Sequence, residues 1–426
     1  MKPSAFSELQ KLITEDRLRP STGGKKGVLI ASESDKGRVI NSYSFRNLQQ
    51  KAQVFPLDPN AAVRTRLTHS IEVSQIGRHI AQIVIKNHIN EHAGDYENLA
   101  SFVNLVETAC LLHDIGNPPF GHLGESAVRS WFKKNAPDLN DLVNFDGNPQ
   151  GLRVMSFLSG HDQFGFNLTC SLLLSTVKYP FACNETSKNK FGYFSSESDT
   201  YNKACEILCW EAGKKFPFML LMDTADDIAY SLSDLEDGLE KKIITLDNLK
   251  LEFGSDLFPE GDIDPFIAFK TKIIREAAEL AAKKFTSSLD EVLEGYNHKL
   301  LKDTDTGALI SKINQYARKH IYSHESAEQV ELAGRSVISG LLDHFSILLD
   351  LTEQDFKELV AGTKKGLDFE IRLLRRLPQS YIKKYSNGTC GSEKLRRAQL
   401  IVDFISGMTD DFALETFQIL QGIRIK

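Results

Sequence analysis

Four side chains that can bind metal or move protons gather around one short turn of this sequence. His113 and Asp114 close an apolar helical run and precede GNPPFG, a segment too rich in glycine and proline to continue a helix. His122 and Glu125 follow that turn three residues apart, which is the spacing of neighbours on one helix face. The stretch from Ala109 to Glu125 therefore predicts a catalytic centre built around a bend.

An adjacent histidine and aspartate can also arise by chance, and this chain has a second such pair at His161 and Asp162. A dipeptide of this kind is a weak signal until it has partners elsewhere in the chain. The obvious third ligand is His69, near the start of a long amphipathic helix predicted by the apolar residues between Leu67 and Val84.

The missing acid is predicted on an apolar helix within FPFMLLMDTADDIAYSLSDLEDGLEK. Asp226, Tyr230 and Asp234 recur there at intervals of four, so they share one helix face. An acidic residue in such a setting is costly unless it is paired or coordinates a metal. Asp223 and Asp227 compete for the same role, and spacing excludes neither.

Two imidazoles and two carboxylates would suit Mn, Fe, Co, Ni or Zn, and Mg where oxygen ligands and water dominate. A metal held this way can polarise a phosphoryl group and orient an attacking water. His122 and Glu125 are then predicted to act as an acid/base pair in which the carboxylate orients the ring. The side chains expected to stabilise a polyphosphate are Arg66, Lys178, Lys190 and Tyr230.

The elements that must position these groups are all predicted to be helices. The 426 residues contain no strand-like run or internal repeat, so we expect an all-α protein with a large core or two packed lobes. One helix is expected to start at the Ser and Asp residues of SESDKG, which suit capping positions. Another is expected to start near Asn167 and to stop at Pro180, with Lys178 and Tyr179 in its last turn.

Composition argues against several classes of protein. An apolar content of 41% and a charged content of 25% are ordinary for a soluble globular chain. No apolar run approaches the roughly 18 residues of a membrane span, and a net charge of −6 argues against a surface that is basic throughout for nucleic acid. The six cysteines form no CxxC pair and the first residues lack an apolar signal core, so we expect a reducing, cytoplasmic compartment.

These motifs resemble a known family. The order His, His-Asp and Asp along the chain is the signature of the HD metal-dependent phosphohydrolase superfamily. Longer sequence strings narrow the resemblance to one family within it. LQQKAQVFPLDPNAAVRTRLTHSIEVSQIGR, LLHDIGNPPFGHLGE, NPQGLRV and TADDIAYSLSDLEDG look like the deoxyguanosinetriphosphate triphosphohydrolases, over roughly residues 34–240. The resemblance implies an N-terminal arm (1–33), a multi-helix HD phosphohydrolase core (34–245) and additional C-terminal helices packed on it (246–426).

The resemblance also implies a reaction, in which water attacks the α-phosphorus of dGTP, or of other dNTPs, and releases a deoxynucleoside and intact triphosphate. The implied metal ligands are His69, His113, Asp114 and Asp226, and the implied catalytic pair is His122 and Glu125. The implied substrate contacts are Gln53 at the sugar, Arg66 at the phosphates, Lys178, Tyr179 and Lys190 in the pocket, and Tyr230 and Asp234 at the deoxyribose, where a ring against C2′ would reject a 2′-hydroxyl.

Members of the family further imply a divalent metal (Mn, Mg, Co, Ni, Fe or Zn) and a homo-oligomer, often a hexamer. The resemblance to some members implies activation by a second deoxynucleotide or binding of single-stranded DNA. This sequence has no dedicated row of aromatic and basic residues that would indicate either property. Two other functions compete. An HD enzyme for another nucleotide would not need Tyr230 and Asp234, and a non-catalytic nucleotide sensor or DNA-binding oligomer would not need His122 and Glu125.

Overall fold

Helices make up the regular secondary structure of the computed structural model, which describes residues 5–58, 60–88, 96–160, 162, 164–183, 190–295 and 299–423. Within those ranges there are three isolated β-bridges and no β-strand, so the all-α prediction is confirmed. The α-helices, in chain order, are α1 (Ala5–Lys11), α2 (Val28–Ile40), α3 (Tyr43–Arg46), α4 (Arg66–His88), α5 (Tyr96–Leu112), α6 (Gly121–Asn135), α7 (Asn140–Val143), α8 (Gly147–Arg153), α9 (Cys170–Ser175), α10 (Ser198–Ile207), α11 (Pro217–Glu240), α12 (Leu246–Phe253), α13 (Pro265–Ser287), α14 (Leu289–Leu293), α15 (Asp305–Ala317), α16 (Glu325–Ser346), α17 (Glu353–Val360), α18 (Asp368–Leu374), α19 (Gln379–Asn387), α20 (Glu393–Ser406) and α21 (Asp410–Leu420). The short 3-10 helices are η1 (Asn47–Gln50), η3 (Ser195–Glu197) and η4 (Ser255–Leu257), and η2 (Val154–Leu158) and η5 (Arg318–Tyr322) are π-helical.

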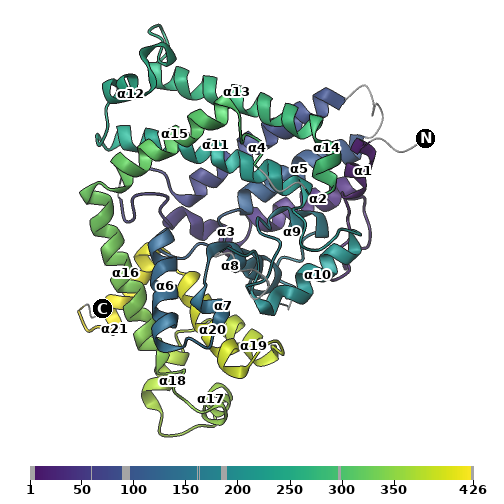
Figure 1. Cartoon of the computed structure of the whole chain (residues 1–426). Coiled ribbons are helices and arrows are strands. Elements are labelled where there is room, and N and C mark those ends of the chain that lie inside the picture. Colours follow the sequence, from purple (N-terminus) through teal and green to yellow (C-terminus); the bar gives the residue numbers. More distant parts are fainter. Residues whose placement is uncertain are drawn as a thin grey trace.

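Two apolar clusters organise these helices. In the first, α4, α5, α11 and α13 pack on one another and occupy the upper half of Figure 1. In the second, α6, α16, α20 and α21 pack together in the lower half of the same view. Ile115 belongs to the first cluster and Phe120 to the second, so the chain crosses from one to the other in the turn between α5 and α6.

That turn has the backbone geometry its sequence predicts. Helix α5 stops at Leu112, and α6 begins at Gly121, so His122 and Glu125 share the first turn of that helix. Phe120 (φ 59°) and Gly121 (φ 54°) both have left-handed backbones. A Cβ at Gly121 would lie 2.8 Å from Nη2 of Arg66, so glycine is required there by both conformation and space.

The predicted start of the second helix at SESDKG is wrong. Helix α2 begins earlier, at Val28, so the polar residues of that string lie inside it. Asp35 is fully buried in the helix, where it forms an ion pair with Arg17 and accepts a hydrogen bond from the backbone N–H of Thr169 at 2.9 Å. Its carboxylate therefore serves a tertiary contact rather than a helix cap.

The helix predicted from Asn167 to the residues before Pro180 is shorter than expected. It is α9, which is capped by Thr169 and ends at Ser175, so Lys178 and Tyr179 lie in the irregular segment after it. Asn167 has φ 49° and its side-chain amide bonds the backbone of Arg19, which prevents helical continuation there. Pro180 disfavours a helical conformation only at Tyr179, so it does not explain the end of the helix at Ser175.

Helix α2 runs across the predicted limit between residues 33 and 34, and α12 begins just after the limit at residue 245. The division into arm, core and C-terminal region stays a prediction. Of the helices described, none is long and apolar enough to cross a membrane. In the second histidine–aspartate pair, Asp162 forms an ion pair with Arg19 at 3.0 Å, and His161 lies outside the described residues.

Candidate active site

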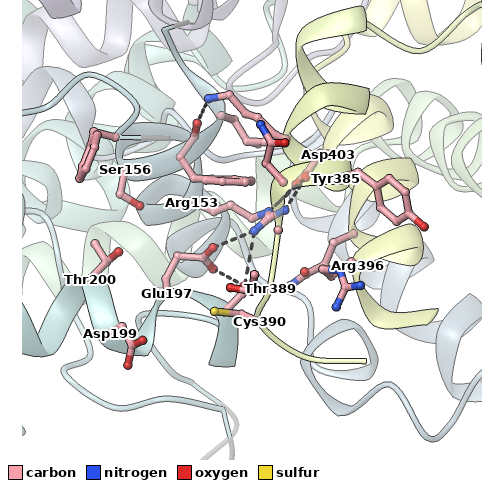
Figure 2. A pocket seen from close by; sticks show the side chains of 18 of the residues that line it. Arg153, Ser156, Glu197, Asp199, Thr200, Tyr385, Thr389, Cys390, Arg396 and Asp403 are labelled. Atoms are coloured by element: carbon pink, nitrogen blue, oxygen red, sulfur yellow. Dashed lines mark hydrogen bonds and ion pairs between the residues drawn. The ribbon is translucent and has the colours of Figure 1, made fainter. Parts of the chain in front are cut away.

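Segments from distant parts of the chain meet around one cavity of about 310 Å³. This volume is within the range of small-molecule sites, roughly 300 to 1,000 Å³. Every residue predicted for the site lines the cavity except Asp234. A slightly larger cavity of about 350 Å³, lined in part by Arg153, Glu197 and Asp403, contains none of the predicted residues (Figure 2). Chemistry rather than size therefore distinguishes the first cavity.

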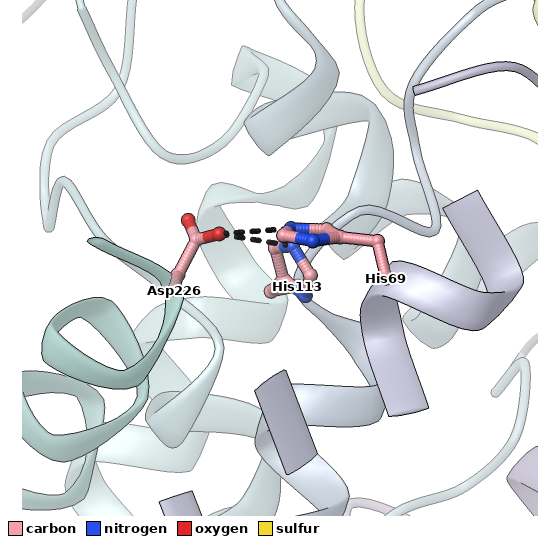
Figure 3. A group of neighbouring side chains, drawn as sticks. All are labelled: His69, His113 and Asp226. Carbon is pink, nitrogen blue, oxygen red and sulfur yellow. Dashed lines mark hydrogen bonds and ion pairs between the residues drawn. The ribbon is translucent and has the colours of Figure 1, made fainter. Parts of the chain in front are cut away.

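Two histidines and an aspartate come together at this cavity from three separate helices or helix ends. His69 lies in the first turn of α4, His113 directly follows α5, and Asp226 lies in α11 (Figure 3). Oδ1 of Asp226 is 3.3 Å from Nε2 of His69 and 3.4 Å from Nε2 of His113. Their potential ligand atoms all lie within 4.8 Å of one another, so the group can hold a metal ion.

Hydrogen bonding fixes which nitrogen of His113 is free to act as a ligand. Nδ1 lies 2.7 Å from the carbonyl oxygen of Cys110, and because a carbonyl can only accept, Nδ1 carries the proton. Nε2 is buried and has no hydrogen-bond partner among the described residues. A buried lone-pair nitrogen beside a second imidazole and a carboxylate fits a divalent transition metal.

The three aspartates of α11 that competed at the sequence level have different partners. Oδ2 of Asp226 accepts from Lys178 at 2.7 Å, which turns Oδ1 toward the two histidines. Asp223 forms an ion pair with the same lysine at 3.3 Å, and Asp227 is paired with Lys299. Burial raises the pKa of Asp226, but Lys178 and His113 outweigh it and hold that pKa well below the usual value. Asp226 therefore remains ionised.

Asp114 lies beside this group. Its Oδ2 is 2.5 Å from Nη1 of Arg66 and 3.6 Å from Nε2 of His113, and its Oδ1 accepts from the Asn117 side chain at 2.6 Å. Burial opposes ionisation, but His113 and Arg66 outweigh it and lower the pKa of Asp114. The carboxylate is thus charged and adjacent to the histidines, and its role as a fourth ligand stays a prediction.

The second pair, His122 and Glu125, occupies the first turn of α6. Nδ1 of His122 lies 3.2 Å from Oε2 of Glu125, and the other oxygen, Oε1, accepts from the backbone N–H of Gly147 at 2.8 Å. The His122 side chain is 85% exposed to the cavity, whereas that of Glu125 is 7% exposed. The hydrogen bond that His122 donates to Glu125 raises the pKa of His122, so the ring holds a proton more strongly than a free histidine does.

Tyr230 presents its hydroxyl to a small polar network below the cavity. That hydroxyl is hydrogen-bonded to the hydroxyl of Tyr322, which also donates to Oδ2 of Asp234 at 2.7 Å. Asp234 is completely buried and does not reach the cavity, and burial raises its pKa to about 7. Asp234 therefore lies behind Tyr322, one hydrogen bond away from the cavity lining.

The remaining predicted contacts line the walls. Oε1 of Gln53 is buried and finds no donor within the described part of the chain. Nζ of Lys190 lies 5.5 Å from the centre of the Tyr179 ring, a cation–π geometry. Both side chains reach the same cavity as Arg66.

Comparisons with known proteins agree with this geometry. Residues 66–145 match the HD domain model and residues 371–419 match the phosphohydrolase-associated domain model. The chain is 33% identical to the deoxyguanosinetriphosphate triphosphohydrolase of Enterobacter sp. (strain 638) and 34% identical to that of Klebsiella pneumoniae (strain 342), in each case over 96% of this chain and 97% of the relative. The enzyme of the same name from Cronobacter sakazakii (strain ATCC BAA-894) is 34% identical over 93% of this chain and 94% of its own length.

The chain belongs to the deoxyguanosinetriphosphate triphosphohydrolase family. The family assignment from sequence motifs is therefore confirmed, as is its placement in the metal-dependent HD superfamily. The HD match contains His69, His113 and the pair on α6, whereas Asp226 lies beyond it on α11. The second match covers most of the helices from α18 to α21.

Several side chains in this family member's cavity had no role predicted from the sequence. They include Asn117, Phe120, Arg318, Tyr322 and Glu331. Arg318 and Tyr322 are four residues apart in η5, so a shared helix face was the available signal. The others are brought to the cavity by the turn before α6 and by α16, and their local sequence carries no comparable pattern.

Proposed function

We propose that this chain hydrolyses dGTP, and other deoxynucleoside triphosphates where the pocket admits them, to a deoxynucleoside and inorganic triphosphate. The observation that carries the proposal is the presence in one cavity of the group His69, His113 and Asp226 together with the His122–Glu125 pair. The names of the relatives, all deoxyguanosinetriphosphate triphosphohydrolases, support this substrate.

In this proposal His69, His113, Asp114 and Asp226 hold one divalent metal, with Mn, Fe, Co, Ni, Zn and Mg all compatible with nitrogen and carboxylate donors. The bound metal would supply Lewis-acid polarisation of a phosphoryl oxygen and of the attacking water. The hydrogen bond from Lys178 keeps one oxygen of Asp226 turned toward the histidines. The unpartnered Nε2 of His113 supports the same assignment.

His122 acts as the general acid. As water attacks the α-phosphorus, the bond from phosphorus to the 5′ oxygen breaks and that oxygen needs a proton. A histidine with a raised pKa, exposed to the cavity and backed by a carboxylate, can supply it. Glu125 is held by the N–H of Gly147 and so fixes the ring orientation.

The proposed substrate contacts are assigned from the charges of the side chains that line the cavity. Arg66, Lys178 and Lys190 would face the triphosphate, because cations stabilise its charge. Tyr230 would lie against C2′ of the sugar, with Asp234 acting through Tyr322, and Gln53 and Tyr179 would complete the pocket. The buried acceptor on Gln53 supports a donor on the ligand, such as a sugar hydroxyl.

The test is product analysis by anion exchange after incubation of the purified protein with each dNTP and Mn or Mg. Deoxynucleoside plus triphosphate from dGTP alone indicates a strict dGTPase, and the same products from several dNTPs indicate a broader enzyme. Diphosphate or orthophosphate would contradict the proposal and favour another HD reaction. No product from single dNTPs or from dNTP mixtures would favour the sensor reading.

Partners belong to the proposal as well. We expect a homo-oligomer, with a hexamer as the first state to test by light scattering of the eluted protein. Activation by a second dNTP and binding of single-stranded DNA are tested by rate measurements with dNTP mixtures and by fluorescence anisotropy of a labelled oligonucleotide. The cytoplasmic location stays a prediction.

A further inference from the structure

Two loops that line the cavity are bonded to the corner between α20 and α21. Lys51 is 4% exposed, and its Nζ donates to the carbonyl oxygen of Asn117 at 2.6 Å and to that of Ser406 at 2.7 Å. Asn117 lies in the turn that leads to His122, and Ser406 is the last residue of α20. One side-chain amine therefore joins the turn before His122 to the end of α20.

Asp410, at the start of α21, makes the second connection. It is 3% exposed, and each carboxylate oxygen accepts from a different loop. Oδ1 accepts from the backbone N–H of Phe120 and Oδ2 from that of Ala52, both at 2.9 Å. Ala52 immediately precedes Gln53, and Phe120 is two residues before His122. Both oxygens thus hold backbone next to a predicted site residue.

Helix α20 is also anchored one turn earlier, through Asp403. Asp403 accepts from Arg153 and from Gln150, both in α8, at 2.8 Å and 3.0 Å (Figure 2 shows the arginine between Glu197 and Asp403). Helix α8 also begins with Gly147, whose N–H holds Glu125. The C-terminal corner and the backbone support of Glu125 are therefore parts of one rigid connection.

This arrangement matters because the site is divided between the two apolar clusters. His69, His113 and Asp226 come from helices of the first cluster, whereas His122 and Glu125 lie on α6, in the second. The position of the acid/base pair relative to the metal-type group thus depends on how the two clusters are joined. Lys51 and Asp410 connect the two clusters directly behind the cavity lining, through Asn117, Ala52 and Phe120.

We propose that Lys51 and Asp410 are positioning residues for the reaction proposed above. They hold the segment around Gln53 and the turn before His122 against the corner between α20 and α21, so that the C-terminal helices complete the active site. Among the described residues Lys51 forms no ion pair, and burial lowers its pKa to about 7 against the attraction of Asp410 and Asp114. Burying an amine of this kind away from any ion pair costs free energy, so a gain in stability does not account for Lys51. Its directional bonds instead fix the relative placement of two loops.

The test uses two variants, one that removes hydrogen bonds of Asp410 and one that removes those of Lys51. Asp410→Asn keeps the size of the side chain but offers one acceptor oxygen, so one of the two N–H groups loses its partner. Lys51→Met keeps the length of the side chain and removes both of its hydrogen bonds. The matched control is Lys394→Met on the exposed face of α20, where Nζ is 3.1 Å from Oδ2 of Asp138 and both side chains are about half exposed.

Amide hydrogen exchange is measured on the full-length protein by mass spectrometry. The rate of dGTP hydrolysis in the presence of Mn and the amount of Mn bound to the protein are measured as well. We expect exchange to rise at least tenfold in peptides covering residues 50–55 and 117–125 in Asp410→Asn, with α5 and α13 unchanged. We expect kcat to fall by roughly tenfold to a hundredfold in both variants, the scale of a misplaced catalytic group, with bound Mn unchanged. Lys394→Met should match the wild type in every readout.

Unchanged exchange in both peptides would overturn the positioning role, and so would exchange that rises throughout the chain in both variants, since that marks a general structural role. If the wild type does not hydrolyse dGTP, the proposed function fails, while the exchange pattern still decides whether the two residues hold these loops.

Discussion

Nδ1 of His113 donates a hydrogen bond to the carbonyl oxygen of Cys110, 2.7 Å away and three residues earlier in the chain. Cys110 is in the last turn of α5, where carbonyl groups have no partner within the helix. The histidine therefore satisfies a helix end with one nitrogen and presents the other to Asp226. A helix terminus thus sets both the protonation and the direction of a metal-type ligand.

Replacing Asp226 with alanine should abolish metal binding and dGTP hydrolysis while the helical fold is kept, because Oδ1 is the only carboxylate oxygen grouped with both histidines among the described residues. Bound Mn is measured by elemental analysis after gel filtration, and fold by circular dichroism. Asp223→Ala is the control, since Asp223 contacts Lys178 outside this group, and it should retain the metal. Undiminished Mn in Asp226→Ala would remove the ligand assignment.

Replacing His122 with alanine should slow dGTP hydrolysis by about 10²- to 10⁴-fold, the usual contribution of a general acid or base. Bound metal should stay at the wild-type level, because His122 belongs to α6 and not to the metal-type group. The rate is measured at saturating dGTP. His79→Ala, on the exposed face of α4, provides a control histidine and should leave the rate unaltered. A normal rate in His122→Ala would make that residue structural.

Truncating Tyr230 to alanine should let GTP compete with dGTP, because the ring that excludes a 2′-hydroxyl is gone. We expect the ratio of kcat/KM for dGTP over GTP to fall by at least tenfold, on the scale of the roughly 10² discrimination that a pocket achieves against one added hydroxyl. Tyr230→Phe retains the ring and loses only the hydrogen bond to Tyr322, so it should keep most of the discrimination. If the alanine variant still rejects GTP, the sugar is read elsewhere.

Asp234→Asn should change how stability depends on pH. Burial raises the pKa of Asp234 from 3.8 to about 7, so between these values the folded protein binds a proton that the unfolded chain releases. The stability contributed by the protonated carboxyl is complete below pH 3.8 and is lost as pH rises through 7, by up to about 1.4 kcal/mol per pH unit. Asparagine does not titrate, and its side-chain oxygen can still accept from Tyr322.

The measurement is the thermal midpoint of wild type and variant at pH 5 and pH 8 without added metal. The thermal midpoint of Asp234→Asn, relative to that of the wild type, should be higher at pH 8 than at pH 5. Asp262→Asn, in the exposed loop before α13, should show no such difference. A constant gap between wild type and Asp234→Asn at both pH values would contradict a protonated, buried carboxyl.

Local pattern was enough to predict the parts of the site that lie within one helix or turn. The end of α5 before His113, the bend of GNPPFG and the restart near His122 follow from apolar periodicity and from the conformational limits of glycine and proline. The shared face of Asp226, Tyr230 and Asp234 follows from the helical repeat. Such features depend only on neighbouring residues, so the sequence by itself determined them.

Contacts between distant segments could be decided only by tertiary packing. Spacing alone did not distinguish Asp226 from Asp223 and Asp227, and it is Asp226 that meets His69, 157 residues away. Asp35 forms a buried pair with Arg17 in place of its expected capping role. Asp410 holds Phe120 across 290 residues. Which buried donor meets which acceptor depends on how the two apolar clusters dock, because every buried polar group must find a partner where packing places it. Helix periodicity carries no information about that arrangement.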